Sequence, residues 1–202
     1  MVVGVVLVVV GLAVLGWFGY QYIGTSIVAR QGYEQQAGEL EQQWIAGTAD
    51  TADPADRMPG AAVAIMRVPA FGADWQVPIL DGTDEAVLAR GLGWYENTAG
   101  PGKVGNFAVA GHVVTHGQPF NKLPSLPAGS IVEVETREAT YSYVIDSSTE
   151  VKDTETWVLD PVPGEAGREP TEELITLTTC ADVFRSPDRY IAFGHLVSVA
   201  TK

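Results

Sequence analysis

The run Leu174-Ile175-Thr176-Leu177-Thr178-Thr179-Cys180 is apolar and β-branched, and it ends on the only cysteine in the 202-residue chain. Such a composition favours a β-strand. Successive strand residues point to opposite faces, which puts Leu174, Thr176 and Thr178 on one face. A single cysteine cannot form an intrachain disulfide, and a thiol at the end of a strand is held by the sheet yet open to a ligand. Cys180 is therefore a candidate nucleophile.

The chain from residue 60 onward repeats this pattern of short apolar runs between turns. The runs expected to be strands are 61–68, 75–80, 106–111, 131–136, 140–147, 156–159, 173–179 and 190–199. A short helix is expected over Asp84–Arg90, with Thr83 as its cap, and residues 91–105 and 161–170, rich in Gly or Pro, are expected to be loops. About eight short strands separated by turns favour a closed barrel or a sandwich.

The first 29 residues carry no charged side chain, and residues 1–18 are almost wholly apolar. About 20 helical residues, at roughly 1.5 Å each, cross the hydrocarbon core of a bilayer. Trp17, Tyr20 and Tyr22 follow at the end of this run, where interfacial aromatic residues gather. We expect residues 1–23 to form an uncleaved transmembrane anchor. The alternative is a signal peptide, whose apolar region is usually shorter, about 7–15 residues.

Residues 24–59 read as a juxtamembrane helix and a linker. Tyr33, Ala37, Leu40 and Trp44 form one stripe of a helix, which is either a stalk or a helix lying on the domain. The following residues 47–59 contain Pro and several Asp, as linkers do. The catalytic domain is expected over residues 60–202.

The net charge of −13 argues against a nucleic-acid partner, because phosphate binding needs basic surface. We find no phosphate-binding loop, no dinucleotide-binding glycine pattern and no metal-spaced His/Cys cluster, so no cofactor is expected. A large acidic domain after an anchor predicts a single-pass protein of the plasma membrane with its domain outside the cell.

Two further residues are suited to work with the thiol. His112 follows the run 106–111, and an imidazolium beside a thiol lowers the thiol pKa from about 8.5. Arg189 begins the run 190–199, and antiparallel pairing with 173–179 would return it to Cys180, where its planar fork can donate two hydrogen bonds. Arg185 lies in the connecting loop and is expected to be a solvated charge. Taken singly, such a His is equally well a turn residue, and such a Cys a small buried hydrophobe.

Three motifs in the same order resemble the sortase family. Thr176–Cys180 is similar to the sortase TLxTC motif, Gly105–His112 to the segment that ends in the catalytic His, and Asp188–Ile191 to the element that carries the catalytic Arg. The two turns at 119–123 and 127–130 are also similar to sortase turns. The resemblance covers about residues 61–199.

The resemblance implies a mainly β fold, an eight-stranded closed sortase-type barrel with short helices. It also implies a membrane-held transpeptidase that cuts an LPxTG or LAxTG sorting signal between Thr and Gly. The acyl group would pass through a thioester to an amine of a peptidoglycan precursor or a pilin lysine. Cys180 would be the nucleophile, His112 the acid or base, and Arg189 the group that holds the substrate backbone or the oxyanion.

Secondary candidates for substrate binding or support of the site are Thr179, Val113 and His116, with His116 at the rim. The chain is most similar to class E sortases of actinobacteria, which tend to favour LAxTG. Members of that class commonly carry Arg directly after the catalytic His, whereas this chain has Val113. The choice between Ala and Pro in the signal is therefore open.

Other readings of the same residues remain open. A wall-linked L,D-transpeptidase also uses Cys and His, but its Ser-x-Gly-Cys signature does not match Thr178-Thr179-Cys180. A papain-like protease has its Cys before its His, the reverse of the order here. The reading from a different class is a non-catalytic, membrane-tethered adaptor that uses the barrel for binding.

Overall fold

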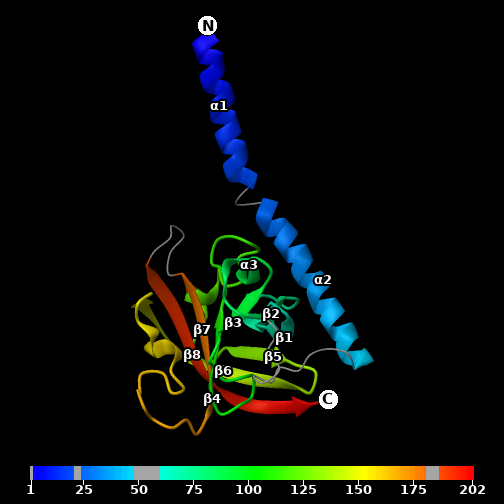
Figure 1. Cartoon of the computed structure of the whole chain (residues 1–202), viewed down its shortest axis with the longest axis vertical. Coiled ribbons are helices and arrows are strands. Elements are labelled where there is room, and N and C mark those ends of the chain that lie inside the picture. Colours follow the sequence, from blue (N-terminus) through cyan, green and yellow to red (C-terminus); the bar gives the residue numbers. More distant parts are fainter. Residues whose placement is uncertain (1, 21–23, 48–59, 181–186) are drawn as a thin grey trace.

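The computed structural model describes residues 2–20, 24–47, 60–180 and 187–202. In these ranges eight strands close into one barrel in the order β1-β2-β3-β4-β7-β8-β6-β5. The strands are β1 Ala62–Arg67, β2 Gln76–Asp81, β3 Leu92–Trp94, β4 Gly105–Ala110, β5 Ile131–Glu135, β6 Ala139–Lys152, β7 Glu173–Cys180 and β8 Asp188–Thr201. The predicted eight-stranded closed barrel is confirmed (Figure 1).

The strands β4 and β7, which lead to His112 and Cys180, are largely buried. All six residues of β4 are buried, and so are five of the eight residues of β7. These two strands run parallel to each other, and strands buried on both faces read as nearly continuous apolar runs. The core against which they pack includes Trp94, Phe107 and Phe120. Burial of these apolar side chains stabilises the barrel, so the ends of β4 and β7 are held in a defined position.

Two local predictions were wrong. Residues 156–159, expected as a strand, form the 3₁₀ helix η5 Thr156–Leu159, because Trp157 stacks on Phe193 and Val158 packs into a small core beside β8. The short strand β3 falls in the expected loop 91–105. Its three residues are too few to show a period of two, and its pairing with β2 and β4 makes it a strand.

The short helices lie between strands. They are α3 Glu85–Leu88, η3 Pro69–Phe71 and η4 Leu123–Ser125. The cap of α3 is Asp84 rather than the predicted Thr83, since the Asp84 carboxylate accepts hydrogen bonds from the amides of Ala86 and Val87.

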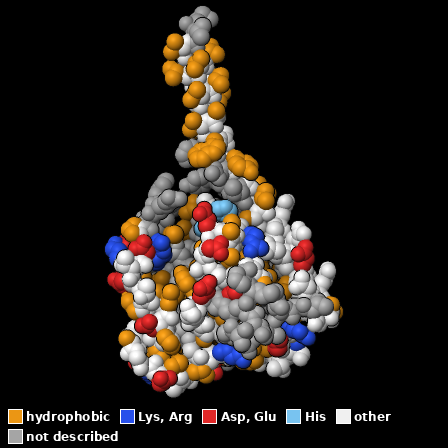
Figure 2. All heavy atoms as spheres, in the orientation of Figure 1, with side chains coloured by type: hydrophobic (Ala, Val, Ile, Leu, Met, Phe, Trp, Pro, Cys, Tyr) orange, Lys and Arg blue, Asp and Glu red, His pale blue; other side chains and the backbone are white. Residues whose placement is uncertain are grey.

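Helix α1, Val2–Gly19, projects away from the barrel and carries exposed apolar side chains such as Val3, Leu7 and Trp17 (Figures 1 and 2). Within the described ranges, no helix has both the length and the apolarity needed to cross a membrane. The transmembrane anchor predicted over residues 1–23 is thus not supported by the structure: α1 has 18 residues, and residues 1 and 21–23 lie outside the description.

Helix α2, Thr25–Ala46, lies against the barrel. Its residues Ala37, Leu40 and Trp44 pack on Ile65 of β1, and Tyr33 joins the main core. The predicted stripe is therefore the buried face. Of the two readings of this helix, the packing agrees with a helix that lies on the domain.

Candidate active site

Cys180 and Arg189 lie directly opposite each other on β7 and β8. The two strands pair antiparallel from Leu174↔His195 to Cys180↔Arg189. Residues paired in this way point to the same face, with Cβ atoms about 4.5–5.5 Å apart. Both residues are half-buried at the end of the barrel. The predicted antiparallel pairing of these two segments is confirmed.

The parallel pairing of β4 with β7 brings His112 to the same end. Its register runs from Gly105↔Glu173 to Ala110↔Thr178, an offset of 68 residues. The Gly111 amide continues the ladder by donating to the Thr178 carbonyl at 3.0 Å. Because His112 and Cys180 are also 68 residues apart, the same register carries His112 to the level of the thiol. The three side chains therefore lie at the ends of three adjacent strands: Cys180 on β7, Arg189 on β8, and His112 just after β4.

Thr179 ties the His-bearing segment to the Cys-bearing strand. Its side chain points away from the face of Cys180 and is 3 % exposed. The Thr179 hydroxyl donates to the Gly111 carbonyl at 2.7 Å. Since Gly111 immediately precedes His112, this bond fixes the backbone before His112 relative to β7.

Thr179→Val should remove this bond while keeping the shape of the side chain. A buried carbonyl left without its donor costs about 1–3 kcal/mol, so we expect a loss of that order in the free energy of unfolding, measured in urea. Thr179→Ser keeps the hydroxyl and is the matched control. A loss in Thr179→Ser with none in Thr179→Val would show that the methyl group, and not the hydrogen bond, matters.

The surroundings of His112 favour its neutral form. The side chain is half-buried, and its Nε2 has no hydrogen-bond partner among the described residues. Burial lowers the pKa of His112 below its ordinary value, the positive charge of His116 lowers it further, and Glu85 opposes both effects. A neutral imidazole accepts a proton, so His112 can act as a base near neutral pH.

This shift in pKa has a consequence for stability. The unfolded chain, whose His112 keeps the ordinary pKa of 6.5, takes up the proton first as the pH falls. The free energy of unfolding should thus be undiminished above that pKa and should decrease as the pH falls from it toward the lower pKa of the folded chain. We expect urea unfolding at about pH 7.5 and about pH 5.5 to show a larger decrease in the parent than in His112→Gln. Equal decreases would contradict the placement of His112 in a desolvated site.

Two of the three secondary candidates, Val113 and His116, lie in the loop after His112. Val113 is half-buried, and the ring of His116 lies 5.1 Å from the ring of His112, at an angle of 31°. His116 Nδ1 is 3.1 Å from the hydroxyl of Thr115. His116 is therefore a neighbour of His112, and its place at the rim of a substrate site stays a prediction. Arg185 lies outside the described residues.

The structure adds a contact that sequence reasoning missed. The Tyr95 hydroxyl lies 3.1 Å from the hydroxyl of Thr178, which is two residues before Cys180 and on the same face of β7. The alternation of the run 174–180 could have placed Thr178 beside the site. Tyr95 had no such signal, because it follows β3, which was read as a loop.

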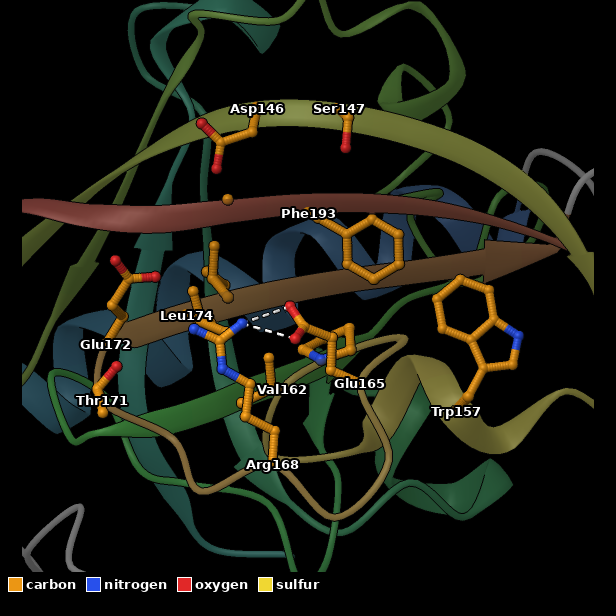
Figure 3. Close-up of a pocket in the computed structure, with 13 residues that line it drawn as sticks. Asp146, Ser147, Trp157, Val162, Glu165, Arg168, Thr171, Glu172, Leu174 and Phe193 are labelled. Carbon is orange, nitrogen blue, oxygen red and sulfur yellow. Dashed lines mark hydrogen bonds and ion pairs between the residues drawn. The ribbon is translucent and has the colours of Figure 1, made fainter.

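A cavity of about 310 Å³ lies at the opposite end of β7, where Leu174 and Ile175 form part of its wall (Figure 3). Arg168 and Glu165 form an ion pair of 2.6 Å at its mouth, and Trp157 and Phe193 lie along one side. None of the three predicted catalytic residues lines it. Leu174 and Cys180 are six residues apart on one strand, or about 20 Å, so this cavity is separate from the candidate active site.

Within the described part of the chain, no group of three or more His, Cys, Asp or Glu side chains could hold a metal ion. The fold and the candidate site together define a closed eight-stranded β-barrel with Cys180 and Arg189 paired at one end and His112 carried to the same level. The chain belongs to the sortase family: the sortase domain matches residues 66–197.

Related proteins and solved structures that are similar to this chain are also sortases. Sortase SrtE1 of Streptomyces coelicolor is 34 % identical over 203 residues, which cover 96 % of this chain and 56 % of the relative. Sortase SrtE2 of the same organism is 27 % identical over 97 % of this chain and 81 % of its own length. Sortase E from Streptomyces avermitilis is 40 % identical, with a TM-score of 0.65 over 71 % of this chain and 93 % of that structure. The chain thus spans just over half the length of SrtE1.

Proposed function

We propose that the chain is a cysteine transpeptidase that cleaves a sorting signal of LPxTG or LAxTG type between Thr and Gly and transfers the acyl group to an amine. The main support is the pairing of Cys180 with Arg189 across β7 and β8, together with the register that carries His112 to the same level. Family membership supports the chemistry, since sortases are cysteine transpeptidases. The structure of sortase E1 from Streptomyces coelicolor with a tripeptide in its active site supports a peptide substrate.

The first half of the reaction forms a thioester. The Cys180 thiolate attacks the carbonyl carbon of the substrate Thr, and the carbonyl oxygen becomes an oxyanion. Arg189 donates hydrogen bonds to this oxyanion, or to the substrate backbone beside it. The bond between Thr and Gly then breaks, and His112 gives a proton to the leaving amine.

The second half reverses these steps with a new amine. The amine attacks the thioester carbon, His112 accepts its proton, and the Cys180 thiolate leaves. The lowered pKa of His112 suits the proton-accepting role, whereas the first half needs the protonated form.

The proposed partners are secreted proteins that carry the sorting signal, and an amine of a peptidoglycan precursor or a pilin lysine as acceptor. Membrane attachment through residues 1–23 is part of the proposal, and it rests on the apolar sequence of that segment. It predicts that the intact mass of the chain from the membrane fraction includes residues 1–23. A mature chain without them would indicate a signal peptide instead.

The test of the reaction uses the full chain in mild detergent with LPxTG and LAxTG peptides and an added amine. Mass spectrometry should detect the peptide cut after Thr and joined to the amine, and the ratio of the two products reports the Ala or Pro preference. Peptide that binds without cleavage would favour the adaptor reading. Hydrolysis without any amine product would contradict transpeptidation.

A further inference from the structure

We propose that Tyr33 of helix α2 is a positioning residue for catalysis: it fixes the loop 113–119, which follows His112 and contains His116, so that α2 belongs to the catalytic unit. The inference rests on the proposed role of His112. The sequence identified Tyr33 only as one residue of an apolar stripe.

Two side chains of α2 bind the backbone of this loop. The Tyr33 hydroxyl donates a hydrogen bond to the His116 carbonyl, and Arg30 Nε donates to the next carbonyl, that of Gly117, at 3.2 Å. Tyr33 is 3 % exposed, and burial raises its pKa, which keeps the hydroxyl protonated as a donor. Helix α2 thus holds two consecutive carbonyls of the loop from outside the barrel.

The loop adopts a backbone conformation that needs such support. His116, Gly117 and Gln118 have consecutive φ values of 51°, 80° and 55°. Residues other than Gly are strained in this left-handed region and persist there only where the surroundings impose it. The Tyr33 ring packs directly on the backbone of Gly117, because a Cβ built on Gly117 would lie 2.7 Å from Cε2 of the ring. The hydroxyl and the ring therefore fit the loop in one position.

The position of this loop affects the surroundings of His112 through two contacts. Its two ends are joined by a hydrogen bond of 3.0 Å from the Phe120 amide to the His112 carbonyl. The ring of His116 lies 5.1 Å from the ring of His112. A shift of residues 116–118 would change both the burial of His112 and its distance from the charge of His116.

The charged and titratable groups around His112 come from several elements. His116 on its own loop and Glu85 of α3 act on His112 electrostatically, and Arg30 and Tyr33 reach the loop from α2. The strand register places Cys180 of β7, paired with Arg189 of β8, at the same level. Of these, His116 is held in place directly by Tyr33. Removal of the Tyr33 hydroxyl should therefore act on His112 through His116 and through solvent access.

The test is Tyr33→Phe in the full chain, which keeps the ring and removes the donor. Losing one hydrogen bond lowers the population of the competent loop, so we expect kcat to fall about fivefold with little change in KM. We also expect the pKa of His112, followed by NMR of its ring, to rise toward its ordinary value. The limb of the kcat/KM profile that follows His112 should move to higher pH with it.

Tyr143→Phe is the matched control. Tyr143 is also buried, and its hydroxyl also binds loop backbone, by accepting a hydrogen bond from the Gly102 amide at 2.7 Å. This variant should lose stability as Tyr33→Phe does, yet leave the pKa of His112 and kcat unchanged. Arg30→Gln, which removes the second bond to the loop, should shift the His112 titration in the same direction as Tyr33→Phe.

Two outcomes would overturn the inference: an unchanged His112 titration in both Tyr33→Phe and Arg30→Gln, or an equal shift in Tyr143→Phe. The NMR titration does not need turnover. If the parent proves inactive on peptide, the proposed function fails, while the titration still decides whether Tyr33 positions His112.

Discussion

Cys180→Ala is expected to abolish both cleavage and transfer of the sorting-signal peptide. Removing the nucleophile of an acyl transferase lowers kcat by a factor on the order of 10⁶. Cys180 is half-buried at the end of β7 and lies outside the main core, so the fold should survive the substitution. The measurement is product formation by mass spectrometry, with circular dichroism to verify the barrel.

The control for this variant is alkylation of the parent. Cys180 is the only cysteine, so any uptake of iodoacetamide reports this site alone. A reactive thiolate should be modified at neutral pH with parallel loss of activity, and His112→Ala should slow the modification. Turnover that persists in Cys180→Ala would refute the transpeptidase proposal.

Arg189→Lys is expected to lower kcat/KM by most of the factor of about 10²–10³ that one aimed donor to an oxyanion contributes. Lys keeps the positive charge but loses the planar fork that donates to two oxygens at once. Arg189→Ala should lose as much or more. Arg189 pairs with Cys180 across β7 and β8, and its Nη2 lies 4.0 Å from a carboxylate oxygen of Asp153, a partial counter-charge.

Arg168→Ala is the matched control for these variants. Arg168 is exposed, pairs with Glu165 and lines the cavity at the other end of β7. Exposed ion pairs contribute little, so kcat/KM should stay within about twofold of the parent. A crippled Arg168→Ala beside a nearly normal Arg189→Lys would mean that the site lies at the cavity of Figure 3 and not at Cys180.

Three consequences separate the proposed enzyme from an adaptor of the same fold. An adaptor would bind the peptide equally well with Ala at position 180, would not need the guanidinium of Arg189, and would show no amine-dependent product. The pairing of Cys180 with Arg189 favours the enzyme, because it places a possible nucleophile beside a possible hydrogen-bond donor for an oxyanion.

The sequence by itself determined most of the barrel and the identity of the three candidate catalytic residues. Strands such as β4 and β7 were predicted because a buried strand leaves a continuous apolar and β-branched run, which is a local signal. The meeting of Cys180 with Arg189 was also predicted, since β7 and β8 follow each other in the chain and antiparallel pairing of neighbours is the simplest arrangement.

Only the tertiary structure decided the short elements β3 and η5 and the contacts between residues far apart in the sequence. β3 is too short to show a period, and η5 took the place of a strand because Trp157 and Val158 found partners beside β8. The approach of His112 to Cys180 depends on parallel pairing of β4 and β7, and the Tyr33 bond joins residues 83 apart. Hydrophobic patterns specify which face of an element is buried, but they do not specify the partner that covers it. That choice is made only when distant elements pack together.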